Sequence, residues 1–315
     1  MLNLAVIGAG NWGRNLIRVF DSLDDVNVDL ICDTNSAATD GHLNVGIVDF
    51  PEAVMCADYI DAVVIATPSP THYDLAAAAI EAGKHVFVEK PMTMNVGDAE
   101  SLVASAANRN VKLMVGHLLE YHPAVDFMDI EAHAGNSVGK PFCIHTQRLN
   151  NGIVRTTENA WWSLAPHDIS VACYLFDATP TTVSATSLSH RRMGIPDMVW
   201  ATLVFPENRV AHIHVSWSDS RKTRKITMIG PRGSVVWNDV NPTPRVDVWT
   251  GKGYPRTPII PDAEPLRLEC QHFIDCIVDD ETPRSDGADG LRVVKVLAAG
   301  EASLREGGNL VEVNL

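Results

Sequence analysis

The chain has 315 residues, of which 46% are hydrophobic and 20% charged, a composition typical of a globular protein with a full core. This length predicts about two domains. The formal net charge of −14 argues against nucleic acid or an anionic membrane as a partner, because neither attracts an acidic surface. No apolar run reaches about 18 residues, and no basic segment precedes the first apolar stretch, so we expect a cytoplasmic protein with no transmembrane helix or signal peptide.

The six cysteines include no CxxC pair, and several lie inside apolar runs. This pattern favours small buried side chains in a reducing compartment over disulfides or zinc ligands. The cysteines are Cys32, Cys56, Cys143, Cys173, Cys270 and Cys276.

A glycine-rich turn follows the first apolar run, Leu4–Ile7, and precedes an amphipathic stretch over residues 16–20. The run predicts a strand buried on both faces of a parallel sheet, and the stretch predicts a helix. Between them, Gly8 permits the sharp turn, Gly10 lets the backbone approach a pyrophosphate, and Gly13 lets the helix pack closely on the strand. This context predicts dinucleotide binding, with the phosphates at the helix N-terminus.

The second predicted strand, Val28–Cys32, ends at Asp33, which lies 20 positions after Gly13. A carboxylate at this point accepts hydrogen bonds from the adenosine ribose hydroxyls. It also repels a 2′-phosphate, and no Arg or Lys occurs between Asp33 and Lys84, so the sequence favours NAD over NADP. The alternative is that Asp33 only caps the turn over residues 34–36.

Strands continue to alternate with helices through the first part of the chain. Strands are expected at residues 47–50, 61–66, 85–89 and 111–116, and helices from about Pro51, at 73–82 and at 96–109. This alternation implies right-handed βαβ units and a doubly wound parallel sheet of the Rossmann type. We expect residues 1–120 to form an NAD-binding domain.

From about Gly139 the apolar stretches alternate with polar residues at period two. Examples are Val199–Phe205, Val210–Trp217 and Lys225–Gly230. Such strands have one solvent-facing or partner-facing side, which fits an open, mostly antiparallel sheet. Helices are expected at 168–176, 264–279 and 286–305. We expect residues 121–315 to form an α+β domain for substrate binding and oligomerisation, whose C-terminal helices are able to pack back on the first domain.

Lys90 is a candidate catalytic residue because ligands of doubly wound sheets bind beyond the carboxyl ends of the strands. It follows a predicted buried strand directly, and Pro91 fixes its backbone. Its amine would hydrogen-bond a substrate hydroxyl and favour the developing alkoxide. The alternative is a surface lysine paired with Glu89.

His167 is the second candidate. Pro166 is expected at the start of a helix, which places the His167 imidazole near a helix N-terminus, where its neutral, proton-accepting form is favoured. The alternative is a structural hydrogen-bonding group. His212 and His214 share one strand face, but no third ligand is expected nearby, so we predict no metal site.

Together these motifs resemble the glucose-fructose oxidoreductase, inositol dehydrogenase and rhizopine-catabolism (Gfo/Idh/MocA) oxidoreductase superfamily. They are Gly8–Gly13, Thr67-Pro68 with His72, Glu89-Lys90-Pro91, and His167-Asp168. The resemblance covers nearly the whole chain, and the Glu-Lys-Pro element is its most specific piece. Residues 116–124, Arg148-Leu149-Asn150 with Arg155, and 162–168 resemble members that act on nucleotide-linked sugars, including dehydrogenases that oxidise C3 of UDP-linked N-acetylglucosaminuronic acid.

The resemblance implies that Lys90 and His167 are the catalytic pair and that the peptide before Pro91 is cis. The chain departs from the family pattern at two places. Many members carry an Asp four residues before the histidine, where this chain has Ser163, and an acidic residue three places after it, where this chain has Ser170. Asp168 is expected to compensate.

We therefore predict an NAD-dependent oxidoreductase that oxidises a secondary hydroxyl, expected at C3, of a nucleotide-linked sugar or sugar acid. The predicted cofactor-binding residues are Gly8, Gly10, Asn11, Trp12, Gly13, Asp33, Thr67, Pro68, His72, Glu89 and Lys90. The predicted substrate-binding residues are Lys90, Tyr121, Arg148, Asn150, Arg155, Trp162, His167 and Asp168. The family leads us to expect a homodimer or homotetramer.

Two alternatives remain open. The first is a dehydrogenase of free sugars or inositols, which needs no phosphate-binding arginines. In that case Arg148 and Arg155 form ion pairs instead of binding a diphosphate or uronate. The second is a non-catalytic regulatory protein that senses NAD or a sugar, to which Ser163 and Ser170 lend weight.

Overall fold

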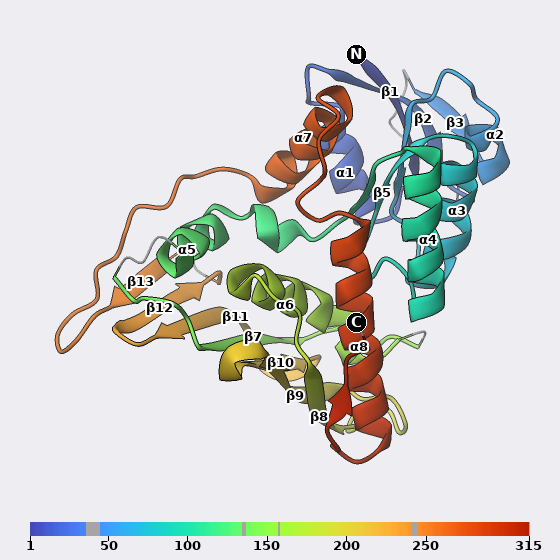
Figure 1. Cartoon of the computed structure of the whole chain (residues 1–315). Coiled ribbons are helices and arrows are strands. Elements are labelled where there is room, and N and C mark those ends of the chain that lie inside the picture. Colours follow the sequence, from blue (N-terminus) through green and yellow to red (C-terminus); the bar gives the residue numbers. More distant parts are fainter. Residues whose placement is uncertain (36–44, 134–136, 157, 241–244, 315) are drawn as a thin grey trace. The chain divides into compact units, whose positions relative to one another are not determined.

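The computed structural model describes residues 1–35, 45–133, 137–156, 158–240 and 245–314. The chain divides into two compact units, the first made of Met1–Leu118 with Glu264–Val294 and the second of Leu119–Ala263 with Lys295–Leu315 (Figure 1). Residues 264–294, which the sequence analysis assigned to the second domain, thus group with the first unit. The aromatic core explains this grouping, because Phe273 packs edge-to-face against Phe20 and Phe87.

The first unit is built on a six-stranded sheet in the order β3-β2-β1-β4-β5-β6. Its strands are β1 (Leu2–Ile7), β2 (Val26–Cys32), β3 (Gly46–Val48), β4 (Ala62–Ile65), β5 (His85–Val88) and β6 (Leu113–Val115). All five strand pairs are parallel. The predicted Rossmann architecture is confirmed, and the order changes direction between β1 and β4, where such sheets bind ligands.

Helices flank this sheet. They are α1 (Gly13–Phe20), α2 (Pro51–Met55), α3 (His72–Glu81), α4 (Val96–Arg109), α7 (Pro265–Val278) and the first part of α8 (Gly287–Arg305). Helices α1 and α7 pack on each other, as do α3 and α4, which lie side by side in Figure 1. Asn95 caps α4 by accepting the backbone N–H of Asp98, and Asn110 ends it in the left-handed conformation.

The second unit is built on an eight-stranded sheet in the order β13-β12-β11-β7-β10-β9-β8-β14. Its strands are β7 (Cys143–Asn151), β8 (Thr182–Leu188), β9 (Met198–Phe205), β10 (Arg209–Ser216), β11 (Ser218–Gly230), β12 (Gly233–Asn238), β13 (Arg245–Trp249) and β14 (Val311–Glu312). Strands β7 and β10 pair in parallel, and the other described pairs are antiparallel. This confirms the predicted, mostly antiparallel sheet.

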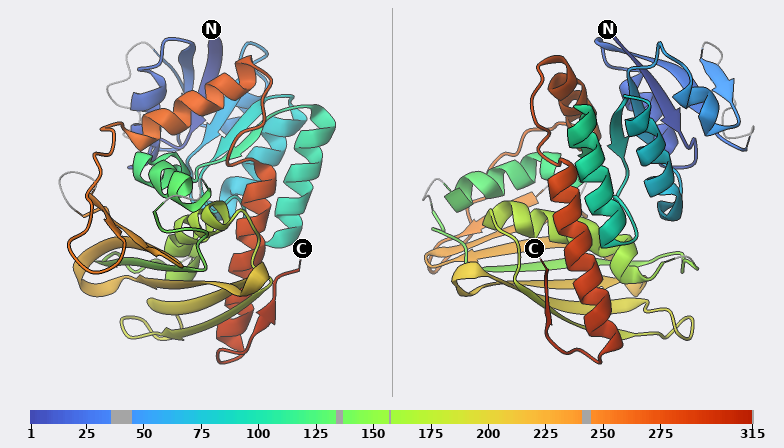
Figure 2. Two further views of the ribbon diagram at one scale, coloured as in Figure 1. Left: turned by 60° about the vertical axis from the view of Figure 1, so that its left-hand side comes forward. Right: turned by 45° about the vertical axis from the view of Figure 1, so that its right-hand side comes forward.

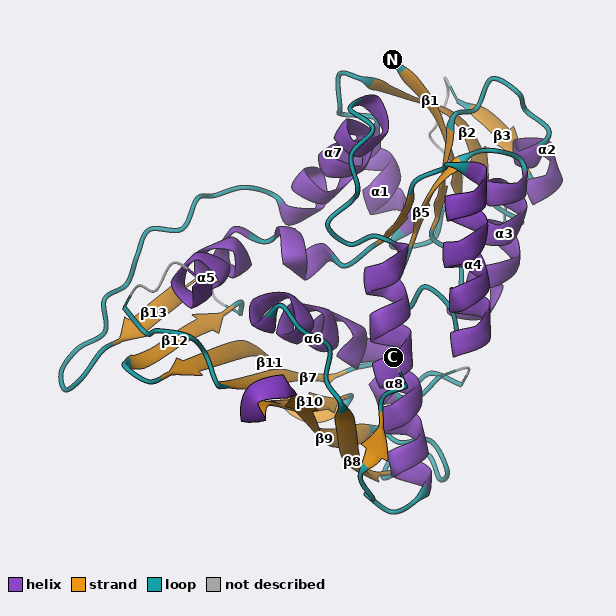
Figure 3. Ribbon diagram, viewed as in Figure 1, coloured by secondary structure: helices purple, strands orange, loops and turns teal. Residues whose placement is uncertain are grey.

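Helix α6 (Ala160–Phe176) covers one face of this sheet, where it contacts β7, β9 and β10, and α5 (Pro123–His133) packs on α6 (Figures 2 and 3). Side chains alternate along the strands, so Ile144 and Ile213 are buried while His145 and His212 are exposed. We call the side that carries His145 and His212 the open face. No helix in the described parts of the chain is long and apolar enough to cross a membrane.

Candidate functional site

A cavity of about 500 Å³ opens at the carboxyl ends of β1, β2 and β4 in the first unit. Five predicted cofactor-binding residues line it, namely Gly8, Gly10, Asp33, Thr67 and Pro68. Sequence reasoning missed other residues of its wall, among them Thr34, Pro51, Thr71, Asp74 and Leu75. These residues come from the segments that directly follow the strands. The rule that ligands bind where the strand order changes direction therefore predicts the place of the cavity but not every residue of its wall.

The glycine turn has the shape that a pyrophosphate needs. Gly8 adopts φ +98°, and a Cβ there would lie 2.8 Å from the carbonyl carbon of Ala66. A Cβ on Gly13 would lie 1.9 Å from the Gly8 oxygen, so only glycine lets α1 begin this close to β1. A Cβ on Gly10 would meet no described atom within 4 Å. The open space above Gly10, at the N-terminus of α1, fits the phosphates of a dinucleotide.

Asp33 both caps a turn and lines the cavity. Its Oδ1 accepts the N–H of Asn35 at 2.8 Å, and its Oδ2 accepts the N–H of Ala9 at 2.7 Å. Each carboxylate oxygen has a second lone pair, which leaves acceptors for the ribose hydroxyls of NAD. The two interpretations offered by the sequence are therefore compatible, and the carboxylate is oriented by the backbone on both sides.

Glu89 lies buried directly before Lys90, at the end of β5. The indole N–H of Trp12 donates to its Oε1, and the backbone N–H of Lys90 lies 3.3 Å from its Oε2. Burial raises the pKa of Glu89, and the positive charge of Lys90 offsets part of this effect. The Lys90–Pro91 peptide is cis, as the family resemblance implies. Glu89 and Trp12 thus connect the glycine turn to the segment that carries Lys90.

His72 occupies a buried bridging position, with 1% of its surface exposed. Its Nδ1 lies 2.8 Å from the carbonyl oxygen of Pro91, and its Nε2 lies 2.9 Å from that of Thr67. The ring therefore joins the loop after β4 to the loop after β5. Its described contacts are with the backbone of these loops, and its predicted part in cofactor binding stays a prediction.

The predicted environment of His167 is wrong in one respect. The helix begins at Ala160 instead of Pro166, and the side chain of Asn159 caps it by accepting the N–H of Trp162 at 3.1 Å. His167 therefore lies inside α6, and the argument from a helix N-terminus does not apply to it. Pro166 lies inside the helix and has no backbone N–H to donate, and most residues of α6 are buried, so tertiary packing favours the helix despite the proline. Asn159 is a common type of N-cap residue, and in the sequence it would have indicated a helix that begins at Ala160.

Asp168, the neighbour of His167, is paired with Arg148 of β7. Its Oδ2 accepts Arg148 Nε at 2.7 Å, and its Oδ1 accepts Nη2 at 3.4 Å. Both side chains are buried, with exposed fractions of 10% for Arg148 and 1% for Asp168. The structure thus gives Arg148 a carboxylate partner and Asp168 a guanidinium partner.

The other predicted substrate residues of the second unit differ in exposure. Tyr121 and Trp162 are buried, and Asn150 is half-buried on β7. Arg155 is exposed, with its Nη1 3.1 Å from Glu158 Oε1. At the two departures from the family pattern, Ser163 is buried, and the Ser170 hydroxyl donates to Glu120 Oε1 at 2.6 Å. Ser170 therefore contacts an acidic side chain from another element.

Sequence reasoning missed three groups of functional interest. Arg224 and Asp239 lie with Arg148 and Asp168 around a small cavity, and burial lowers the pKa of Arg224 and raises that of Asp239. In the first unit, His117 Nδ1 lies 2.6 Å from Asp289 Oδ2. Burial pushes the pKa of Asp289 upward, but hydrogen bonds and charge from His117 and Arg292 outweigh it and lower the pKa.

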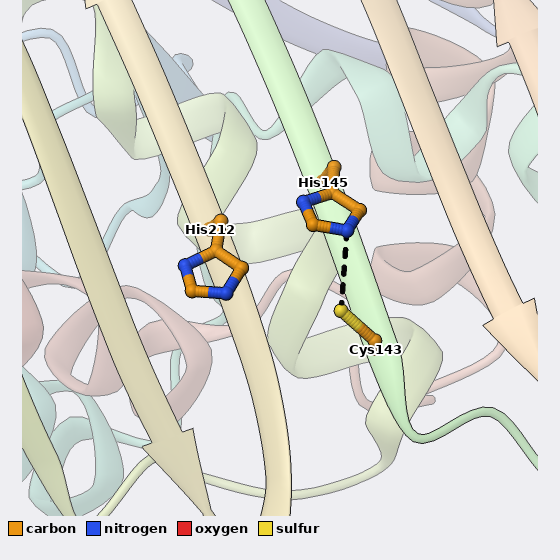
Figure 4. A group of neighbouring side chains, drawn as sticks. All are labelled: Cys143, His145 and His212. Atoms are coloured by element: carbon orange, nitrogen blue, oxygen red, sulfur yellow. Dashed lines mark hydrogen bonds between the residues drawn. The ribbon is translucent and has the colours of Figure 1, made fainter.

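The third group lies on the open face, where Cys143 and His145 of β7 lie beside His212 of β10 (Figure 4). No third ligand was predicted near His212 and His214, because the pairing of β7 with β10, which places His145 opposite His212, cannot be read from the sequence.

Comparison with known proteins gives matches along both units. A model of the GFO/IDH/MocA oxidoreductase family, described as an NAD-binding Rossmann fold, matches residues 2–117, and a model of the GFO/IDH/MocA C-terminal domain matches residues 131–236.

Three relatives illustrate the range of activities. The chain is 25% identical over 318 residues to UDP-N-acetylglucosamine 3-dehydrogenase of Acidithiobacillus ferrooxidans (93% of this chain, 94% of the relative). A solved structure of that enzyme superimposes with a TM-score of 0.88 at 22% identity, covering 97% of this chain and 98% of that one. Identity is 27% over 264 residues to scyllo-inositol 2-dehydrogenase of Bacillus subtilis (79% and 76%). It is 24% over 255 residues to 2,7-anhydro-N-acetylneuraminate hydratase of Escherichia coli (75% and 67%).

Proposed function

This chain belongs to the GFO/IDH/MocA oxidoreductase family and carries its NAD-binding Rossmann domain, and we propose that it oxidises the C3 hydroxyl of a nucleotide-linked sugar or sugar acid. The main support for NAD-dependent oxidation is the cavity between Gly10 and Asp33, because its glycine turn and carboxylate fit a dinucleotide. The substrate part is supported by the similarity to a UDP-N-acetylglucosamine 3-dehydrogenase along more than nine-tenths of both chains.

In this proposal two side chains act on one hydroxyl. NAD, when bound, supplies C4 of the nicotinamide as the acceptor of the hydride from the substrate carbon. Lys90 donates a hydrogen bond to the hydroxyl oxygen and stabilises the negative charge that develops on it. His167 accepts the hydroxyl proton as general base. The alcohol thus loses one hydride and one proton and becomes a ketone.

Arg148 and Asp168 are positioning residues in the proposal. Asp168 follows His167 in α6, and its two hydrogen bonds to Arg148 tie this part of the helix to β7. A fixed helix backbone limits the directions in which the His167 imidazole points. This contact supplies support at a place where Ser163 and Ser170 replace the acidic residues of many relatives.

The test uses the full-length protein, NAD and a panel of UDP- and dTDP-sugars, with NADH formation as the readout. Lys90→Met and His167→Gln should each lower kcat by about 10²–10⁴, because that is the usual contribution of such groups, while the Kd for NAD changes little. Lys140→Met and His133→Gln alter exposed side chains and serve as matched controls. Wild-type turnover in both Lys90 and His167 variants would refute the assignment.

A second candidate is a dehydrogenase of free sugars or inositols. It is favoured by one observation, namely that both arginines predicted to bind phosphate already have a carboxylate partner, Asp168 for Arg148 and Glu158 for Arg155. The similarity to a scyllo-inositol 2-dehydrogenase agrees with it. Calorimetric titration with UDP alone separates the two candidates, because only a nucleotide-sugar site gives binding heat.

We also propose that the protein works in the cytoplasm as a homodimer or homotetramer that associates through the open face. This face exposes Trp200, which has 38% of its surface accessible. Sedimentation velocity with the wild type and Trp200→Glu tests the proposal. A charge placed at a self-association surface should convert the oligomer to monomer, and a monomeric wild type would contradict it.

A further inference from the structure

The open face of the second unit carries a cluster of soft and borderline metal ligands. Cys143 and His145 are two residues apart on β7, so their side chains leave the same side of the strand. His212 lies directly opposite His145 on the neighbouring strand β10. Figure 4 shows the three side chains on the same side of the two strands, with the Cys143 sulfur next to His145 and the His212 ring beside them.

The distances suit a tetrahedral metal. One ligand atom from each side chain lies within 4.8 Å of the other two. The Cys143 Sγ is 3.4 Å from His145 Nε2. The imidazole rings of His145 and His212 are stacked at a centroid distance of 5.2 Å, so one of the two rings has to turn before both bind one ion in their ring planes. Zinc binds sulfur at about 2.3 Å and imidazole nitrogen at about 2.0–2.1 Å, which in a tetrahedron separates S and N by about 3.6 Å. The pair from β7 is therefore already close to its ligating geometry.

A neighbouring strand orients the third ligand. Thr202 of β9 pairs with His212, and its Oγ1 lies 3.0 Å from His212 Nδ1. With the Nδ1 proton donated to this hydroxyl, Nε2 carries the lone pair, and Figure 4 shows the second ring nitrogen of His212 on the side of Cys143. Hydrogen bonds of this kind to the non-ligating nitrogen are the usual support of metal-bound histidines.

The ligand atoms determine which class of metal fits. The cluster offers one cysteine sulfur and two imidazole nitrogens. The donor set of one sulfur and two nitrogens selects zinc-like ions over magnesium or calcium.

We propose that Cys143, His145 and His212 form a binding site for a zinc-like divalent transition metal, with the fourth position open. A cavity of about 570 Å³ lies over His145 and His212. It is part of the open face proposed above for self-association, so the fourth position is open in the single chain and faces the interface in an oligomer. Helix α6 covers the opposite side of the same strands, so the site lies apart from His167 and is independent of the proposed hydride transfer.

The experiment uses the full-length protein after chelator treatment, titrated with Co²⁺ and then with Zn²⁺. We expect one Co²⁺ per chain, a sulfur-to-cobalt charge-transfer band in the near ultraviolet, and displacement of cobalt by zinc. Cys143→Ser should abolish the band, and His145→Gln and His212→Gln should each weaken Zn²⁺ affinity by about 100-fold or more.

Two matched controls make the result specific. His214→Gln alters the next histidine on the same face of β10, and Cys56→Ser removes a cysteine that the structure exposes. Both should keep the wild-type band and affinity. No Co²⁺ or Zn²⁺ binding to the wild type at micromolar concentrations would overturn the proposal, as would a band that survives Cys143→Ser or disappears with Cys56→Ser. Circular dichroism of each metal-free variant checks that the variant is folded, so that a loss of metal binding is not caused by unfolding.

Discussion

Arg148 and Asp168 form a buried ion pair in which Nε of the guanidinium lies 2.7 Å from Oδ2 of the carboxylate. Removal of one partner leaves the other charge buried without compensation. Asp168→Ala should therefore lower the free energy of unfolding by about 3–5 kcal/mol, as measured by urea denaturation. Glu81→Ala breaks the exposed pair between Glu81 and Arg109 and should cost less than about 1 kcal/mol. Equal losses in the two variants would show that Asp168 is not a structural partner of Arg148.

Two alanine substitutions in the glycine turn should affect different properties, one the stability of the protein and the other its affinity for NAD. In Gly13→Ala the new Cβ meets the Gly8 oxygen at 1.9 Å, so we expect a loss of about 3 kcal/mol or more of stability and a marked fall in Tm. In Gly10→Ala the new methyl group points into space that is open among the described residues. Stability should change by less than about 1 kcal/mol, while the Kd for NAD rises about tenfold or more. A Gly10→Ala protein with unchanged NAD affinity would place the pyrophosphate elsewhere.

Asp33 should determine the choice between NAD and NADP. Asp33→Asn removes the charge that repels a 2′-phosphate and weakens the acceptors for the ribose hydroxyls. We expect the Kd for NAD to rise by about 10-fold to 100-fold and the preference over NADP to shrink, since a hydrogen bond to a charged group contributes about 1.5–3 kcal/mol. Asp21→Asn, at the exposed end of α1, is the control. Fluorescence titration with NAD and with NADP measures the ratio of the two Kd values. An unchanged ratio in Asp33→Asn would contradict the role of Asp33 in cofactor choice.

His122 should make stability depend on pH. Its Nδ1 accepts the N–H of Ala124 at 3.0 Å, its ring lies 4.4 Å from that of Trp237, and burial lowers its pKa from 6.5 to about 4. The folded protein keeps the ring neutral while the unfolded chain protonates it, so this contribution is present above pH 6.5 and is lost as the pH falls toward 4. The loss by pH 4.5 should be between about 2 and 3 kcal/mol.

The measurement for His122 compares unfolding free energies at pH 7.0 and pH 4.5 in the wild type and in His122→Asn. The amide oxygen of asparagine still accepts the Ala124 N–H but does not titrate. The stability difference between the two proteins should therefore shrink, or change sign, at the lower pH. His190→Asn alters an exposed imidazole and should follow the wild-type pH profile. Parallel profiles for the wild type and His122→Asn would exclude His122 as the source.

The sequence was most informative where a residue pattern has one structural solution. Apolar runs such as Ala62–Ile65 and His85–Val88 predict doubly buried strands, and the glycine turn with Asp33 predicts the dinucleotide cavity. The strands and the turn are predictable because each depends on residues that are close together in the sequence. Helix α6 shows the limit of local rules, since Pro166 indicated a helix start and tertiary packing extended the helix back to Ala160.

The cluster on the open face lay beyond sequence reasoning for a different reason. Cys143 and His145 are separated from His212 by more than sixty residues, and they meet only because β7 and β10 pair in one particular register. A shift of that register by one residue would turn His145 and His212 to opposite faces. The partner of Arg148 was hidden in the same way, because Asp168 lies on a helix and Arg148 on a strand.

The imidazole of His72 has a consequence for how substitutions far from the chemistry will behave. One ring spans the carbonyl groups of Thr67, in the wall of the dinucleotide cavity, and Pro91, next to Lys90. Among the described contacts, the His72 ring therefore joins the loop after β4 to the loop after β5. Substitution of this buried side chain should accordingly change both the affinity for NAD and the turnover.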